Sequence, residues 1–369
     1  TSVLRPTVLE NRTRGGGLPP AACSQRRSIW YDRPFQDPPL GPDRVQEFVL
    51  GAVSKTTYDG ATSWFSYDET GRLRWVVQEL PGVGVKTLDY TYDFLGNLLE
   101  VAYQKGEPDA FFHHYEYDAD HRLSRAYTSP DGITRALLAH YTYYLHGPLK
   151  RVEIADPLQA VDYAYTIQGW LKTINQPNAA ADPTPDGPAT TGVPADLFAA
   201  SLTYFPNDYA SRQTPAPTTT GNLPGAAQHN GTIWANHWKT PSAPDIRMYG
   251  YQYDPRNQLT QAAFGTLDPA TTAFQPHPAN AYAEGQLRYD ANGNIERLQR
   301  TDGVGFSTAD YSYHYTPGTN QLAKLEDQAG QPLEKYEYDA TGQLTAQRAT
   351  TGGSGYLTYD VTGKVTGVY

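Results

Sequence analysis

A short frame of sequence, Tyr-Asp-x-x-Gly-x-Leu, recurs along this chain. In one clear copy, Tyr336 and Tyr338 lie two residues apart, so their side chains share one face of a strand. Asp339 accepts hydrogen bonds from the backbone that follows it and opens a turn. Gly342 adopts the positive φ that reverses the chain, and Leu344 begins the return strand. Each copy therefore predicts one β-hairpin.

The frame returns often enough to predict a repeat architecture. Six further copies keep the aspartate, at Asp68 with Gly71, Asp93 with Gly96, Asp118, Asp254, Asp290 with Gly293, and Asp360 with Gly363. Three weaker copies lack it and begin at Tyr143, Tyr165 and Tyr315. A fixed frame with a period of about 20 to 50 residues signals stacked repeats. Because an isolated hairpin is marginal in water, each hairpin depends on its neighbours for stability.

Composition supports an all-β chain and excludes several classes of protein. The 29 tyrosines favour strands, the 33 glycines and 29 prolines favour turns, and no window shows helical apolar spacing. A net charge of −10 with scattered basic residues argues against nucleic-acid binding. No apolar run is long enough to span a membrane. The single cysteine, Cys23, excludes an internal disulfide framework, and we interpret it as inert.

The distribution of the frame predicts four regions. They are an irregular lead-in at 1–45 that covers or plugs a sheet edge, a repeat array at 46–175, an insert at 176–246, and a second array at 247–369 that stops within a repeat. In the lead-in, Ile29-Trp30-Tyr31 is the expected anchor strand. The insert is rich in proline and glycine, with strands expected near 202–205 and 232–238. We read the chain as a segment of a larger polypeptide.

Few residues suggest a ligand site, and we predict no catalytic, metal or cofactor site. His113 and His114 alternate along a strand, so they point to opposite faces and do not share one metal. Trp234 and Trp238 would share a strand face, either as core or as a platform for a glycan. The insert also contains acidic and histidine side chains that could meet, namely Asp182, Asp186, Asp208 and His237. The repeated aspartates argue against catalysis, since an active site needs one constellation rather than seven copies.

The frame resembles the YD repeats of the RHS (rearrangement hotspot) proteins, which are related to repeats in insecticidal toxin complexes and teneurins. The resemblance covers about residues 46–369. Three further stretches look like RHS proteins of the Bacteroidetes kind, namely Tyr144 to Leu149, Asp162 to Leu171, and Asn230-Gly231 followed by Trp238-Lys239-Thr240. The resemblance implies a spiralling antiparallel β-strip that forms part of a hollow shell, in a secreted or surface protein of a bacterium.

In that family the shell commonly encloses a C-terminal toxin domain, and a core domain with Asp-Pro-x-x-Gly motifs closes it. Neither is present in these 369 residues, so both are expected partners from other parts of the same polypeptide, with secretion-system components as further partners. About ten hairpins give a strip of roughly 100 Å, whereas one turn around a 100-residue cargo needs on the order of 140 Å. The sequence thus predicts a non-catalytic scaffold segment. The alternative is an adhesion or glycan-binding module, and an enzyme is the third reading.

Overall fold

The computed structural model describes most of the chain, as two compact units. The described residues are 27–58, 60–155, 158–177, 186, 192–206, 208, 222–243, 245–268, 273–360 and 363–369. Unit 1 contains Thr1–Tyr141, Ile154–Asp156 and Asp360–Lys364, and unit 2 contains Thr142–Glu153, Pro157–Tyr359 and Val365–Tyr369. Most of the predicted lead-in, with Cys23, lies outside the described residues, as does Asp182 of the insert.

The described residues form 25 strands and one short 3-10 turn, η2 (Pro38–Leu40). The first strands are β1 (Arg27–Tyr31), β2 (Val53–Tyr58), β3 (Ala61–Tyr67), β4 (Leu73–Leu80), β5 (Gly84–Tyr92), β6 (Leu98–Tyr103), β7 (Phe111–Tyr117), β8 (Leu123–Ser129) and β9 (Ala136–Tyr143). They are followed by β10 (Leu149–Ile154), β11 (Gln159–Tyr165), β12 (Leu171–Ile174), β13 (Ala199–Thr203), β14 (Ala235–Lys239), β15 (Ile246–Tyr253), β16 (Leu259–Leu267) and β17 (Phe274–Pro276). The last are β18 (Glu284–Tyr289), β19 (Ile295–Thr301), β20 (Ser307–Tyr315), β21 (Leu322–Glu326), β22 (Pro332–Tyr338), β23 (Leu344–Ala349), β24 (Ser354–Tyr359) and β25 (Val365–Val368).

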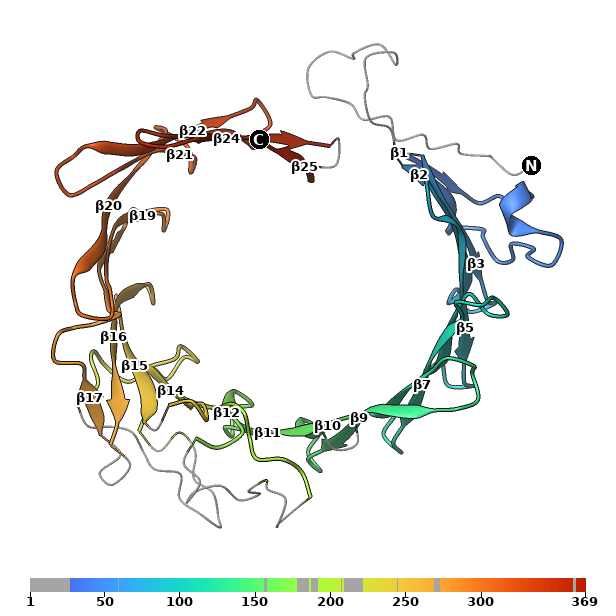
Figure 1. The fold of residues 1–369 in the computed structure, drawn as a ribbon, viewed down its shortest axis with the longest axis horizontal. Coiled ribbons are helices and arrows are strands. Elements are labelled where there is room, and N and C mark those ends of the chain that lie inside the picture. Colours follow the sequence, from blue (N-terminus) through green and yellow to red (C-terminus); the bar gives the residue numbers. More distant parts are fainter. Residues whose placement is uncertain are drawn as a thin grey trace. The chain divides into compact units, whose positions relative to one another are not determined.

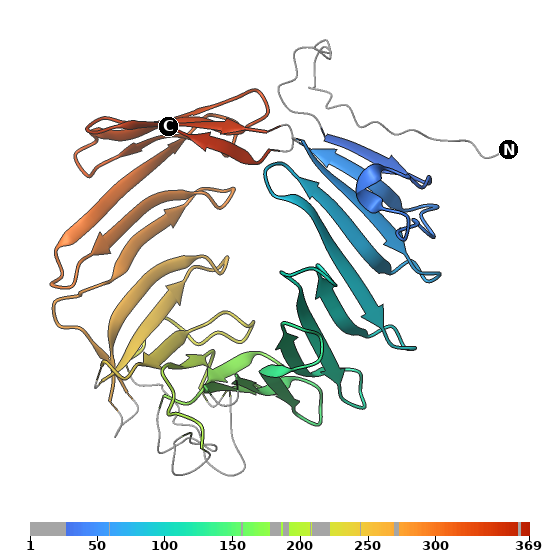
Figure 2. The ribbon, with the colours of Figure 1, turned by 45° about the vertical axis from the view of Figure 1, so that its right-hand side comes forward.

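In unit 1, each strand pairs antiparallel with its neighbours in the sequence, from β1 against β2 to β8 against β9. Figure 2 shows these strands side by side in one layer. The tyrosine and leucine of a frame are cross-strand partners, as in Tyr67 with Leu73, and the register shifts by a β-bulge at the tyrosine. A bulge increases the local twist, so each repeat twists its hairpin at the same place.

Unit 2 is also an antiparallel ladder, from β11 against β12 to β24 against β25. Two strands of the predicted insert take part, because β13 lies between β12 and β14. Strand β16 is paired by both β17 and β18. The frame pairs recur, as in Tyr289 with Ile295 and Tyr338 with Leu344. The prediction of an all-β chain of antiparallel hairpins is confirmed in both units.

The core of each unit is local, because a single-layer sheet is buried only where another segment covers it. In unit 1 the segment before β2 supplies Leu40 and Phe35, which pack on Trp64, Trp75 and Val77. The segment is fixed by polar contacts as well, since the Trp64 indole donates to Asp37 at 2.7 Å.

In unit 2 a second cluster lies beneath part of the insert. Met248 and Phe274 are almost fully buried there, and Leu223 packs against the cluster from the insert. Ala235, Ile246 and Leu267 complete the buried set. Elsewhere the buried strand positions are mostly small, such as Ala102, Ala126 and Ala346. No helix of the described residues is long and apolar enough to cross a membrane.

Candidate functional site

The repeat turn has one geometry, which Asp68 illustrates. The Asp68 amide donates to the Arg72 carbonyl at 2.8 Å, and the Gly71 amide donates to the Asp68 carbonyl at 3.0 Å. One carboxylate oxygen of Asp68 accepts from the amides of Thr70 and Arg72, both at 2.9 Å. Gly71 has φ +83°, a conformation that side chains with a Cβ disfavour. The aspartate therefore satisfies the amides that the reversed chain leaves without a ladder partner.

The other aspartates of the frame make the same backbone bonds. The set is Asp93 with Gly96, Asp118, Asp254, Asp290 with Gly293, Asp339 with Gly342, and Asp360 with Gly363. In the copies of Asp118 and Asp254 the glycine position is occupied by His121 (φ +61°) and Asn257 (φ +62°). In two weaker copies Tyr144 and Thr166 replace the aspartate, and their amides still donate four residues ahead, at 2.9 and 2.8 Å.

The repeat frame did not predict two further turns with this geometry, which lie at Asp302 and Asp327. Their amides donate to Phe306 and Gln331, at 2.8 and 2.9 Å. They join β19 to β20 and β21 to β22, so they lie at the opposite edge of the ladder from the tyrosine turns. No tyrosine precedes either aspartate, and the remaining signal is Asp-x-x-Gly alone.

Three of the turn carboxylates, Asp93, Asp290 and Asp339, are held in the ionised form. The side-chain amide of Asn294, followed by backbone amides, lowers the pKa of Asp290 below its usual range. The Asn97 side chain acts in the same way on Asp93, and the Thr341 hydroxyl on Asp339. An ionised carboxylate that accepts several hydrogen bonds is a good turn former and a poor proton acceptor.

A tyrosine hydroxyl links neighbouring repeats. The frame tyrosine of one hairpin donates to the backbone carbonyl of the residue that begins the return strand of the preceding hairpin. The bonds are Tyr117 to Leu98 (2.8 Å), Tyr289 to Leu259 (2.7 Å), Tyr315 to Ile295 (2.9 Å) and Tyr359 to Leu344 (2.7 Å). Tyr204 makes the equivalent bond to Leu171 at 2.8 Å. This bond explains why the frame uses tyrosine, because phenylalanine would fill the same space without reaching the carbonyl.

His113 and His114 have different surroundings, in keeping with alternation along β7. His114 is 3% exposed, stacks on Phe112 with ring centroids 6.3 Å apart, and lies 3.2 Å from Glu100. His113 stacks instead on Tyr115. Within the described residues, no group of three His, Cys, Asp or Glu side chains is placed to hold a metal ion.

Trp234 and Trp238 also differ in their surroundings. Trp234 is 7% exposed, and its indole N–H donates to the Pro224 carbonyl at 2.9 Å. Trp238 is half-buried and stacks on Tyr249, with ring centroids 5.8 Å apart. Of the two tryptophans, only Trp238 therefore presents its ring to a pocket.

That pocket, which we call the aromatic pocket, has a volume of about 500 Å³. Its aromatic walls are Trp238, Tyr249, Phe264 and Tyr282, and its charged residues are Asp245 and Arg247. The rings contact one another closely, since the centroids of Phe264 and Tyr282 lie 5.3 Å apart in an edge-to-face arrangement. Pockets of this volume with aromatic walls and a few polar groups commonly bind small ligands.

Charged residues of the insert form two separate clusters. Lys172 of β12 donates to Asp208 at 2.8 Å and to the Leu202 carbonyl at 2.5 Å. The other carboxylate oxygen of Asp208 accepts from the Tyr204 amide at 2.8 Å. Burial, and then the charge of Lys172, lowers the pKa of His237 to about 3. Lys172, Asp208 and His237 are each at most 6% exposed, so this cluster fastens the insert to the sheet in a dry environment.

Asp186 belongs to the second cluster, around Arg151. The Arg151 guanidinium donates to Asp186 at 2.7 Å and also binds Asp162 and Glu153. Of the four insert residues that the sequence grouped, Asp208 and His237 thus lie in one cluster and Asp186 in another.

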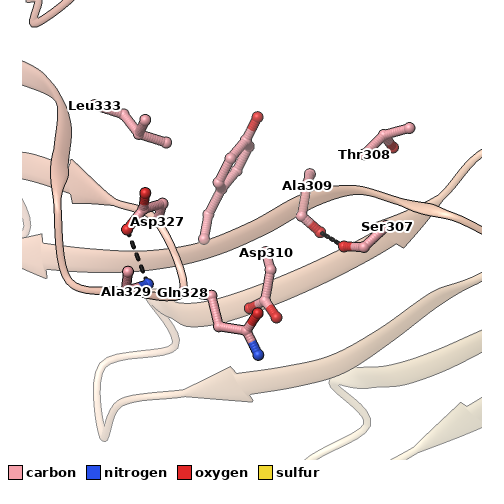
Figure 3. Close-up of a pocket in the computed structure, with 9 residues that line it drawn as sticks. Ser307, Thr308, Ala309, Asp310, Asp327, Gln328, Ala329 and Leu333 are labelled. Atoms are coloured by element: carbon pink, nitrogen blue, oxygen red, sulfur yellow. Dashed lines mark hydrogen bonds between the residues drawn. The ribbon is translucent and has the colours of Figure 1, made fainter.

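A larger and more open pocket of about 880 Å³ lies over β20 and the turn between β21 and β22. Figure 3 shows Asp327 turned toward its own turn, where it accepts from the Ala329 amide at 2.9 Å. Asp310, also in this pocket, is paired with Arg297 at 3.0 Å. Both carboxylates therefore already have structural partners, and the pocket presents no paired acid and base for catalysis.

Hairpins joined by a repeated Asp turn and linked by tyrosine hydroxyls define a β-hairpin repeat protein. No family model matches the chain. The comparison with curated proteins gives no match.

Among solved structures the chain is similar to the TcdB2-TccC3-TEV crystal structure, with a TM-score of 0.37 and 12% identity over 92% of this chain and 19% of that one. It is also similar to the Photorhabdus luminescens Tc holotoxin pore, with a TM-score of 0.38 and 12% identity over 93% of this chain and 19% of that one. The chain thus spans about a fifth of the length of the chains it matches.

Proposed function

We propose that this chain is a non-catalytic segment of the wall of an RHS-type shell. The shell belongs to a larger secreted or surface protein of a bacterium and encloses a C-terminal toxin or other cargo. Its partners are the enclosed domain and a closing core domain from the same polypeptide, with secretion-system components acting on the whole.

The observation that carries the proposal is the tyrosine link between consecutive repeats. Each link bonds one hairpin to the backbone of the hairpin before it, as in Tyr289 to Leu259. The tyrosine bonds supplement the backbone hydrogen bonds between strands. They therefore help to stabilise a sheet of one layer that no second layer covers. A strip of this kind suits a wall better than it suits a compact domain, because most of its side chains remain half-exposed.

Apolar residues at the hairpin tips support the same proposal. Phe94 in unit 1 is 97% exposed and Ile167 in unit 2 is 96% exposed. Each directly follows the residue that opens its turn, Asp93 or Thr166. Ile133, at the other edge of the unit 1 ladder, is 85% exposed. Exposed apolar side chains gathered at edges indicate contact with further protein. In a wall, those edges would pack against adjoining parts of the shell.

The alternative function is an adhesion or glycan-binding module, and the aromatic pocket favours it. The aromatic walls of that pocket include a half-buried tryptophan beside two charged residues. A role in adhesion is compatible with a place in a shell wall, so the two functions are tested separately.

The test of the shell uses limited proteolysis of the natural full-length polypeptide. We expect a C-terminal fragment to survive protease while the wall is intact, and to be digested once Gly342→Val weakens the wall. Thr341→Ser, which keeps the hydroxyl bond to Asp339, is the matched control and should leave protection unchanged. A full-length protein whose C-terminal region is digested as fast in the intact form as in the variant would exclude enclosure.

A further inference from the structure

The aromatic pocket is built on one face of three strands. Trp238 on β14, Arg247 on β15 and Thr266 on β16 are cross-strand partners, so their side chains stand in one row. Tyr249 and Phe264 form the next row on the same face. The floor of the pocket is therefore a rigid sheet, which holds the side chains in fixed relative positions.

The wall that faces this floor is Tyr282, which has an unusual backbone. Its φ is +52°, in the left-handed region that bulky residues avoid. Its carbonyl accepts from the Tyr249 hydroxyl at 2.8 Å, and its amide donates to the Asp302 carbonyl at 2.9 Å. The ring lies so close to Gly303 that a Cβ there would be 2.4 Å from the tyrosine oxygen. The fold thus holds Tyr282 in a strained conformation over the pocket, a feature found at binding sites.

The two charged side chains of the pocket, Arg247 and Asp245, have no partners within the described part of the chain. Arg247 makes no ion pair there, unlike Arg297 with Asp310 or Arg348 with Glu337. Asp245 lies in the same pocket and is exposed. The pocket therefore combines flat ring faces with one cation and one carboxylate that remain available to a ligand.

We propose that the aromatic pocket binds a saccharide ring that carries a carboxylate, such as a hexuronic acid. The apolar C–H face of the sugar would lie on Trp238 and Tyr249, as aromatic side chains favour. The sugar carboxylate would pair with Arg247, whose planar guanidinium suits bidentate contact with carboxylates. Asp245 and Thr266 would bind the hydroxyl groups. The inference goes beyond the shell proposal, because it holds whether or not the wall encloses a cargo.

Two features favour a sugar over an aromatic acid. An aromatic acid would use the rings and Arg247 but would leave Asp245 and Thr266 without a role. A sugar hydroxyl, in contrast, donates and accepts, so it complements a carboxylate and a threonine hydroxyl. The pocket also opens to solvent, which suits the hydrophilic face of a sugar.

The test compares three probes by saturation-transfer NMR on the whole chain. The probes are methyl β-D-glucuronide, the neutral methyl β-D-glucoside, and benzoate. We expect the glucuronide to bind about tenfold more tightly than the glucoside, because only the glucuronide makes the charge-assisted bond. Equal affinity of the two sugars, or binding of benzoate as tight as that of the glucuronide, would overturn the assignment. Silence from all three probes at millimolar concentration would overturn it as well.

The variants locate the binding. Arg247→Gln should reduce glucuronide affinity about tenfold and leave the weak glucoside signal unchanged. Arg288→Gln is the matched control, since Arg288 is also an exposed strand arginine but lies outside the pocket. An unchanged melting temperature for Arg247→Gln shows that it is folded. Loss of binding in both variants, or in neither, would contradict a site at Arg247.

Discussion

The last hairpins and the insert, both in unit 2, are stabilised in different ways. Strands β22 to β25 bury a single residue completely, Ala346, whereas β13 and β14 bury every second residue along much of their length. The hairpins depend on a turn and a tyrosine link that recur in several repeats. The insert depends on contacts that occur once, such as the pair of Lys172 and Asp208.

The cause of the difference is a covering segment. Leu223 and Pro224 lie over β15, where Gly250 leaves room for them, since a Cβ there would be 2.5 Å from Pro224. Figure 1 labels β14, β15 and β16 in order along this part of the sheet. A covered face excludes water, so buried apolar and charged groups accumulate there. The lesson is that repeats distribute stability along the chain, whereas a covering segment concentrates it and builds the walls of a site.

The largest effect is expected from breaking the buried pair of the insert. Asp208→Ala leaves the Lys172 ammonium buried without its carboxylate, which costs about 3–5 kcal/mol. Glu337→Gln, which breaks the exposed pair with Arg348 in a late hairpin, should shift stability far less. Urea denaturation of the two variants measures both changes. If the urea midpoints of the two variants shift equally, the insert does not depend on its buried ion pair more than the late hairpins depend on their exposed one.

The insert and the hairpin turns should lose stability at different pH values when the protein is acidified. The pKa of His237 is lowered from 6.5 to about 3, so the unfolded chain binds a proton first and stability falls as pH drops below about 6.5. The pKa of the turn aspartate Asp290 lies below 3.8, so its contribution is full above that pH and is lost only below it. Denaturation at pH 7, 5 and 3.5 should show an early loss, on the order of a few kcal/mol, that His237→Gln abolishes. Asp290→Asn should lower stability by a similar amount at pH 7 and pH 5 and should leave the early loss unchanged, because the ionised carboxylate contributes fully at both of these pH values.

A smaller effect is expected at the repeat turn. Gly342 has φ +87°, so Gly342→Val places a branched side chain in the left-handed region, at a cost of about 1–2 kcal/mol. Thr341→Ser, next to it and exposed, should cost less because its backbone is not strained and it keeps the hydroxyl bond to Asp339. Melting temperatures of the two variants decide the matter, and equal shifts would mean that the turn tolerates a side chain at the glycine position.

The smallest effect is expected from one tyrosine link. Tyr289→Phe removes the hydroxyl bond to Leu259 and should cost about 0.5–1.5 kcal/mol. Tyr311→Phe is the control, since no hydrogen bond of the Tyr311 hydroxyl is present among the described residues. Combining Tyr289→Phe with Tyr315→Phe should add the two losses, because each link joins a different pair of hairpins. Equal stability of the two single variants would show that the link contributes nothing.

Much of the fold was accessible from local sequence, and much of the site was not. The frame identified the hairpins because a turn is decided within five residues, as at Asp68 and Gly71. It missed Asp302 and Asp327 because their turns lack the tyrosine that made the frame conspicuous. The partner of each tyrosine hydroxyl depends on which strands become neighbours, and no local pattern contains that information.

The sequence by itself determined the unit of this protein, a β-hairpin with an aspartate turn, and its repetition into an antiparallel sheet. Turn chemistry and side-chain alternation act over a few residues, so they are readable without the fold. Only the tertiary structure decided that the Trp234 indole binds the Pro224 carbonyl, that Lys172 meets Asp208, and that Arg247 lies among aromatic rings. These outcomes depend on which segment covers which face, and contacts between distant residues fix that choice.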